Sequence, residues 1–139
     1  MVTKYSKALI VGSGSGLSAS LAQLFAREGF KIALAARNTE KLASLCSSTG
    51  ATAFACDATD ADQVSQLFQN VERKMGEPDV VIYNASARSR GPFISLAASE
   101  VEQAIRTSAF GGFLVAQEAA KRMVQRAMAQ SCLPGRPQA

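Results

Sequence analysis

The chain has 139 residues, enough for one domain with a buried core, and its 47% hydrophobic and 19% charged residues exclude a disordered chain. The formal charge of +4 comes from scattered basic residues, which argues against nucleic acid, and the absence of histidine and of C-x-x-C spacing argues against a metal site. No apolar run reaches the roughly 18 residues of a membrane-spanning helix, and the N-terminus lacks a signal-peptide pattern, so we expect a cytoplasmic protein with no membrane partner.

Four short apolar runs predict β-strands at residues 8–11, 32–36, 52–56 and 80–83. Each run is continuous rather than alternating, as in strands covered on both faces of a parallel sheet. A stretch with helical spacing of apolar residues follows each run, and the last of these stretches covers residues 101–123. The apolar stripes are Leu17, Leu21, Leu24 and Phe25, then Leu42 and Leu45, then Val64, Leu67, Phe68 and Val71, and finally Val101, Ile105, Phe113 and Val115.

Capping signals support these helices. Asp60 is placed to cap the third helix, and Ser99 with Glu102 predicts a capping box for the fourth. Glycines stand where the first three helices should end, at Gly29, Gly50 and Gly76. The alternation of strands and helices, with right-handed crossovers, predicts an α/β fold with a doubly wound parallel sheet over residues 1–124. Four strands in the order 3-2-1-4 leave this sheet incomplete, because no fifth apolar strand follows.

A cluster of glycines joins the first strand to the first helix. Such a turn lets the backbone approach a pyrophosphate, to which the following helix offers its N–H groups and positive dipole end. Many α/β proteins use a glycine turn only to reverse the chain. The position of this one, between a buried strand and an amphipathic helix, favours dinucleotide binding. The residues expected at the cofactor are Gly12, Ser13, Gly14, Ser15, Gly16 and Leu17.

The end of the second strand indicates which dinucleotide is preferred. Units that bind NAD place an acidic residue there, on the ribose 2′-hydroxyl. This strand instead ends in Arg37, which can pair with a 2′-phosphate through a charge-assisted bond. The sequence therefore predicts NADP(H) in preference to NAD(H). The alternative is that Arg37 only lies along the surface at the start of the next helix.

The motifs, taken in order, resemble those of the short-chain dehydrogenase/reductase family. Gly12-x-x-x-Gly16-x-Ser18 resembles the family's Gly-x-x-x-Gly-x-Gly turn, with serine in place of the last glycine. The resemblance implies a Rossmann-type nucleotide-binding domain. It also implies an NAD(P)-dependent oxidoreductase that transfers hydride between the nicotinamide and a small carbonyl or alcohol substrate.

Two further strand ends carry the resemblance. Asp57 and Ala58 resemble the family's Asp-Val motif, which implies that Asp57 bonds the adenine amine and Ala58 shapes the adenine pocket. The alternative for Asp57 is a local turn or cap. The stretch after the fourth strand resembles the Asn-Asn-Ala-Gly motif, and Asn84 there can tie neighbouring strands together through its amide. The residues that this motif adds to the cofactor site are Asn84, Ala85 and Ser86.

Residues 108–111 resemble the Asn-x-x-Gly of the family's fourth helix. Ser108 falls on the position of the catalytic asparagine, which holds a proton-relay water, but serine is too short to reproduce that geometry directly. This helix commonly contributes to the family's subunit interface, which implies a possible homo-oligomer through residues 101–123. The small residues that suit such an interface, or equally close packing on the sheet, are Ala109, Gly111, Gly112 and Ala116.

The family's catalytic Tyr-x-x-x-Lys does not occur in this sequence, because neither Tyr5 nor Tyr83 has a lysine four residues on. We therefore expect the 139-residue chain to be inactive, with no catalytic residues of its own. The alternative function is a non-catalytic dinucleotide-binding or redox-sensing module.

The last stretch, residues 125–139, departs from the family pattern, and Pro134 and Pro137 argue against a continuing helix or a central strand. The possible codons from Arg126 onward, read in a shifted frame, admit Gly-x-Gly-Ala-Ile-Leu-Phe-Thr-Gly-Ala-Thr-Ala-Ser, a typical fifth strand of the family. We therefore expect an aberrant, disordered tail produced by a frameshift near Gln125, which the coding DNA would test.

Overall fold

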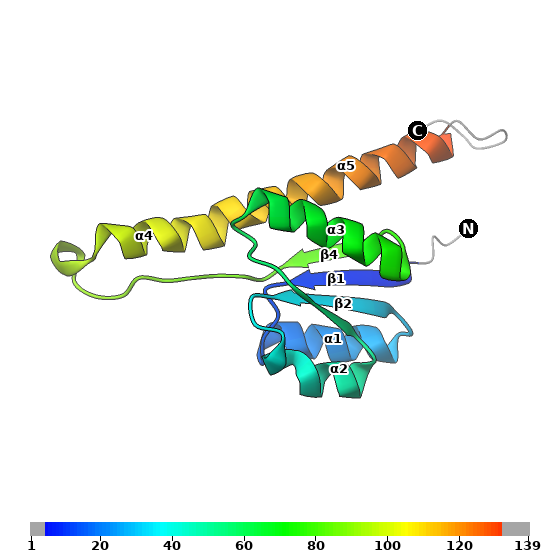
Figure 1. The fold of residues 1–139 in the computed structure, drawn as a ribbon, viewed down its shortest axis with the longest axis horizontal. Coiled ribbons are helices and arrows are strands. Elements are labelled where there is room, and N and C mark those ends of the chain that lie inside the picture. The colour runs from blue at the N-terminus through cyan, green and yellow to red at the C-terminus, as the bar shows by residue number, and fades with distance from the viewer. Residues whose placement is uncertain (1–4, 132–139) are drawn as a thin grey trace.

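The computed structural model describes residues 5–131, which form a four-stranded parallel sheet with helices on both faces (Figure 1). The strands lie in the order β3-β2-β1-β4. The predicted α/β fold, a doubly wound parallel sheet with strand order 3-2-1-4, is confirmed. The strands are β1 (Lys7–Val11), β2 (Lys31–Ala36), β3 (Thr52–Ala55) and β4 (Val80–Tyr83).

The helices form a layer on each face of the sheet. Helices α1 (Leu17–Arg27) and α2 (Ala43–Thr49) cover one face, and α3 (Ala61–Met75) and α5 (Gly111–Ser131) cover the other. Beyond the carboxyl end of β4, a long irregular segment leads to α4, which projects past the sheet in Figure 1. The remaining elements are η1 (Glu40–Leu42), η2 (Phe93–Ser95), α4 (Ala98–Ile105) and the π-helical turn η3 (Arg106–Phe110). None of the helices between residues 5 and 131 is long and apolar enough to cross a membrane.

The core consists of two apolar clusters, one on each face of the sheet. The central strands β1 and β2 are buried almost throughout, as their continuous apolar runs predict. β3 and β4 are only half-buried, because each lies at an edge of the sheet. The parallel registers bring the carboxyl ends of all four strands to one edge.

The predicted apolar stripe of α1 is partly wrong. Leu17 is 61% exposed and Leu24 is also exposed, whereas Ser18 and Ala22 are buried. The face toward the sheet is one residue further along the helix than the leucine spacing indicates. Ser18, rather than Leu17, is the buried residue in the first turn of α1, because its hydroxyl makes the hydrogen bonds described below. The stripes predicted for α2 and α3 do face the core.

The fourth predicted helix is interrupted by the π-turn η3, which corrects two expectations. An extra residue rotates the helix face by about 100°. Ile105 and Phe113 are consequently exposed, while Leu114 lies in the core with Val115. The predicted Ser99–Glu102 capping box is also wrong: α4 starts at Ala98, one turn before Glu102, and its N-cap residue has no side-chain cap bond.

The prediction that the helix stops before residue 125 is wrong as well, since α5 continues to Ser131. No proline interrupts the helix before position 134, and Arg126 ties this part of the helix to the loop between α3 and β4. Its guanidinium pairs with Glu77 at 3.2 Å and with Asp79 at 3.0 Å. The rest of the predicted tail, residues 132–139, lies outside the described residues.

Candidate functional site

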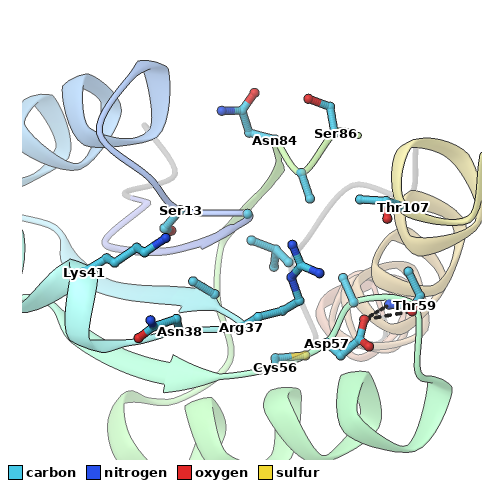
Figure 2. A pocket seen from close by; sticks show the side chains of 15 residues that line it. Ser13, Arg37, Asn38, Lys41, Cys56, Asp57, Thr59, Asn84, Ser86 and Thr107 are labelled. Carbon is cyan, nitrogen blue, oxygen red and sulfur yellow. Dashed lines mark hydrogen bonds between the residues drawn. The ribbon is translucent and has the colours of Figure 1, made fainter. Parts of the chain in front are cut away.

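A cavity of about 320 Å³ opens at the carboxyl edge of the sheet (Figure 2). The ends of all four strands contribute to it, together with η3. Of the predicted site residues it brings together Gly12, Ser13, Arg37, Asp57, Ala58, Asn84, Ala85 and Ser86. The residues that sequence reasoning missed are Val11, Ala36, Asn38, Lys41, Cys56, Thr59 and Thr107.

Gly12 begins the glycine turn in a conformation that requires glycine. Its φ is +86°, and a Cβ there would lie 2.7 Å from the Cβ of Ala85 and closer still to its backbone nitrogen. The Gly12 and Ser13 amides both donate to the Ala35 carbonyl of β2, at 2.9 and 3.0 Å. The turn therefore packs tightly between the ends of β2 and β4.

The rest of the turn, Gly14 to Leu17, is exposed beside this cavity and leads into α1. A Cβ added at Gly14 or at Gly16 would meet no atom within 4 Å, so the space beside both residues is open to a ligand. Gly16 is the N-cap of α1, where backbone N–H groups and the helix dipole favour an anion. The predicted phosphate-facing residues thus lie at one helix end next to the cavity.

Ser18, in place of the family's last glycine, joins this turn to β4. Its buried hydroxyl donates to the Gly12 carbonyl at 3.3 Å and accepts from Asn84 Nδ2 at 3.0 Å. The Asn84 backbone amide in turn donates to the Val11 carbonyl at 2.8 Å. The Asn84 side chain thus bonds Ser18 of α1 through its donor and reaches the turn after β1 only through Ser18; the predicted direct tie between strands through its donor and its acceptor is not observed among the described residues. The sequence signal for this contact was a polar residue, Ser18, next to the apolar residues of α1.

Ser18→Ala should destabilise the chain by about 1–3 kcal/mol, because it leaves the half-buried Asn84 side-chain amide without its partner. Denaturant unfolding measures the effect, with Ser20→Ala on the exposed face of α1 as the matched control. Equal stabilities of the two variants would show that the Ser18 bonds contribute nothing.

Positive charge gathers where β2 ends. Arg37 extends into the cavity, and Lys41 lines it from η1, together with Asn38 (Figure 2). Asn38 also accepts from the Glu40 amide at 3.0 Å, which fixes the turn into η1. A cation four residues after Arg37 was the available sequence signal for Lys41. The arrangement offers two cations to one anionic group.

Asp57 faces these cations from the opposite wall of the cavity. Its Oδ1 accepts from the Thr59 amide at 2.9 Å and from the Thr59 hydroxyl at 2.8 Å. These two bonds, followed by the nearby Arg37 and Arg106 charges, lower the pKa of Asp57. The turn therefore stabilises the fold at neutral pH and loses this contribution as the pH falls through the lowered pKa. The local-turn alternative for Asp57 is observed, while Oδ2 has no hydrogen bond among the described residues.

Cys56 lies beside Asp57 but is buried. Burial, and then the charges of Asp57 and Asp60, raise its pKa to about 11. We expect the Cys56 thiol to resist alkylation at about pH 8 in the folded chain and to react on unfolding, because the thiolate is the nucleophile. Half-buried Cys46 should react before Cys56. Peptide mapping after timed alkylation checks this order, and early labelling of Cys56 would contradict it.

Asp60 confirms the predicted cap of α3. Its carboxylate accepts from the Asp62 and Gln63 amides at 2.9 and 3.1 Å. Gln63 returns toward the site and accepts from the Asp57 amide through Oε1 at 2.9 Å. The α3 cap therefore fixes the chain that carries the Asp57 wall.

Ser108 lies outside the cavity lining, although its neighbour Thr107 belongs to it. The Ser108 hydroxyl exchanges two hydrogen bonds of 3.1 Å with the backbone of Ala87, so it anchors η3 to the segment after β4. Gly111 and Gly112 lie against Tyr83 of β4, so for these two small residues the alternative of close packing on the sheet is observed. An interface with a second copy of the chain stays a prediction. Within residues 5–131, no cluster of acidic, cysteine or histidine side chains could hold a metal ion.

A comparison with protein families decides the identity. The family model described as short chain dehydrogenase matches residues 6–130. The chain belongs to the short-chain dehydrogenase family. Gluconate 5-dehydrogenase of Gluconobacter oxydans is 31% identical to it over 86% of this chain and 49% of that protein. The human 3-oxoacyl-[acyl-carrier-protein] reductase is 25% identical over 84% of this chain and 50% of that protein.

Solved structures agree with this assignment. A short-chain type dehydrogenase/reductase from Mycobacterium marinum matches with a TM-score of 0.84 and 28% identity, over 88% of this chain and 52% of that one. An actinorhodin polyketide ketoreductase crystallised with NADPH matches with a TM-score of 0.82 and 25% identity, over 88% and 49%. This short-chain dehydrogenase chain therefore spans about half the length of the relatives it matches, and its cavity lies in that shared half.

Proposed function

We propose that this short-chain dehydrogenase chain binds NADP(H) in the cavity at the carboxyl edge of its sheet. The single observation that carries the proposal is that two cations, Arg37 and Lys41, line that cavity together with the start of the glycine turn. A 2′-phosphate is the part of NADP(H) that NAD(H) lacks, and two cations match its charge. The NADPH-bound ketoreductase relative supports the same cofactor class.

The donor set of the site fits the whole nucleotide. The exposed Gly14–Leu17 stretch and the α1 N-terminus are suited to the pyrophosphate. The opposite wall, formed by Asp57, Ala58 and Thr107, is suited to the adenine base, and Asp57 Oδ2 would accept from its amine. Asn84 to Ser86 would line the path toward the nicotinamide. No catalytic role is proposed for Ser108, whose hydroxyl bonds the backbone of Ala87.

The proposed activity of the whole protein is hydride transfer between NADP(H) and a carbonyl or alcohol substrate. The bound nicotinamide supplies the hydride chemistry. This chain's residues would bind and orient the nucleotide, while the proton-transfer pair of the family, Tyr-x-x-x-Lys, is absent from the 139-residue sequence. We therefore propose that the 139-residue chain binds the cofactor without turnover.

A combined assay tests this proposal. NADPH should raise the melting temperature of the 139-residue chain, while NADPH oxidation with a 3-oxoacyl substrate and NADP+ reduction with gluconate both stay at the buffer rate. The heat-denatured chain is the control for turnover, and the folded chain without nucleotide is the reference for the melting temperature. An unchanged melting temperature at millimolar NADPH would contradict cofactor binding, and substrate-dependent oxidation of NADPH would contradict the lack of turnover.

A further inference from the structure

Tyr83 stands at the end of β4, where the family's motif has asparagine, and its side chain reaches behind the wall proposed for the adenine base. The ring is half-buried and packs against the core cluster that includes Ala58 and Leu114. Its hydroxyl donates to the Thr107 carbonyl inside the π-turn η3. Ala58 and Thr107 both line the nucleotide cavity, whereas Tyr83 does not. Tyr83 is therefore bonded to one cavity residue, Thr107, and packs on the cluster that contains another, Ala58, without lining the cavity itself.

The Tyr83 side chain lies so close to the start of α5 that only glycine fits at the two positions beside it. A Cβ on Gly111 would overlap the hydroxyl itself, and it would lie 3.0 Å from the Ala58 carbonyl and 3.3 Å from the ring carbon Cζ. A Cβ on Gly112 would lie 3.3 Å from the ring. The hydroxyl, the Ala58 backbone and the start of α5 thus meet at one point, with no room for a further methyl group.

The π-turn makes this contact consequential. A π-helical turn breaks the regular i to i−4 bonding of the helix and is commonly found at functional sites. Here it is held from two directions, by the Tyr83 bond to Thr107 and by the Ser108 bonds to Ala87. It turns Thr107 toward the cavity, opposite the cationic end (Figure 2). The Tyr83 bond therefore fixes the backbone of one wall residue without touching the ligand.

We propose that Tyr83 is a positioning residue for the purine base: its hydroxyl holds Thr107 and the adjoining Ala58 wall in the geometry that presents the base edge to Asp57. This inference rests on the proposed NADP(H) function. It assigns base recognition and 2′-phosphate recognition to opposite sides of one cavity, so the two can be changed separately.

The test compares two affinity ratios in the full 139-residue chain. The ratio of the affinities for NADPH and for its hypoxanthine analogue reports base recognition, because hypoxanthine lacks the amine that would donate a hydrogen bond to Asp57. NADPH against NADH reports 2′-phosphate recognition. Tyr83→Phe should lower the first ratio roughly five-fold, the effect of one hydrogen bond, and leave the second unchanged. Tyr5→Phe, at an exposed tyrosine outside the site, is the matched control and should change neither.

A general loss of folded protein scales all three affinities equally, so it leaves both ratios unchanged and can be told apart from a positioning role. Gly111→Ala supplies a second arm. Its new methyl group would displace the Tyr83 hydroxyl, so it should destabilise the chain and lower the base ratio. Combining it with Tyr83→Phe removes the overlap and should recover much of the stability, while the base ratio stays low.

The outcomes separate the two proposals. A wild-type chain that binds neither NADPH nor NADH overturns the proposed function. A wild-type chain that binds NADPH, with a base ratio unchanged by Tyr83→Phe, overturns only the positioning role. Additive destabilisation in the double variant would also overturn it, because the hydroxyl and the methyl group would then not compete for one space.

Discussion

Replacing Gly12 with alanine should abolish nucleotide binding and destabilise the chain by about 3 kcal/mol or more. The positive φ of +86° is unfavourable for any L side chain, and the methyl group would run into Ala85, which belongs to the cavity wall. The turn cannot move away freely, because the Gly12 and Ser13 amides are bonded to β2. Denaturant unfolding and NADPH titration of the same preparation measure the two losses.

The other glycines of the turn provide matched controls. At Gly14 an added Cβ would meet no atom within 4 Å, and the φ angle of Gly14 is not positive. Gly14→Ala should therefore leave the stability of the chain unchanged. Gly16→Ala should weaken NADPH binding on the order of ten-fold, because the proposed phosphates lie over the α1 N-terminus. It should also cost some stability, because the Gly16 angles, φ −93° and ψ −123°, lie outside the regions that L residues favour. If Gly12→Ala behaved like Gly14→Ala, the close approach to Ala85 would not be required for the fold or the site.

The second large effect concerns the cofactor preference. Arg37→Ala combined with Lys41→Ala should weaken NADPH binding roughly ten- to hundred-fold, the equivalent of about 1.5–3 kcal/mol for a charge-assisted bond to the 2′-phosphate. NADH carries no such phosphate, so its affinity should change little. Paired calorimetric titrations of the variant and the wild type with both nucleotides give the change in preference directly.

General electrostatics must be separated from this specific effect. Arg27→Ala combined with Lys74→Ala removes two exposed cations, from the last turns of α1 and α3, so this double variant controls for the loss of two charges. It should leave the NADPH to NADH preference unchanged at the same ionic strength. Equal weakening of NADPH and NADH by the Arg37 and Lys41 substitutions would contradict a 2′-phosphate site at the end of β2.

Much of the fold follows from local patterns in the sequence. The continuous apolar runs predict all four strands of a parallel sheet, and the glycine turn predicts a helix end beside their carboxyl edge. The parallel topology then brings Arg37, Asp57 and Asn84 to one cavity, although they are far apart in the chain. Motif order was enough here, because each motif follows a strand of the same sheet.

The parts that escaped prediction depend on contacts between distant segments. Ser18 breaks the leucine stripe of α1 because its hydroxyl is bonded to Gly12 and Asn84. The π-turn η3, which shifts the buried face of the fourth helix, has no periodic signature and is held by Tyr83 from β4. Helix α5 continues past its predicted end, where Arg126 pairs with the carboxylates of Glu77 and Asp79. These are tertiary effects that override local propensity.

The most direct test of the account is a calorimetric titration of the 139-residue chain with NADPH. We expect saturable binding of one nucleotide per chain, and a lower affinity for NADH measured under the same conditions. Binding of neither nucleotide, or tighter binding of NADH, would contradict the assignment of the cavity beside Gly12, Arg37 and Asp57 as an NADP(H) site.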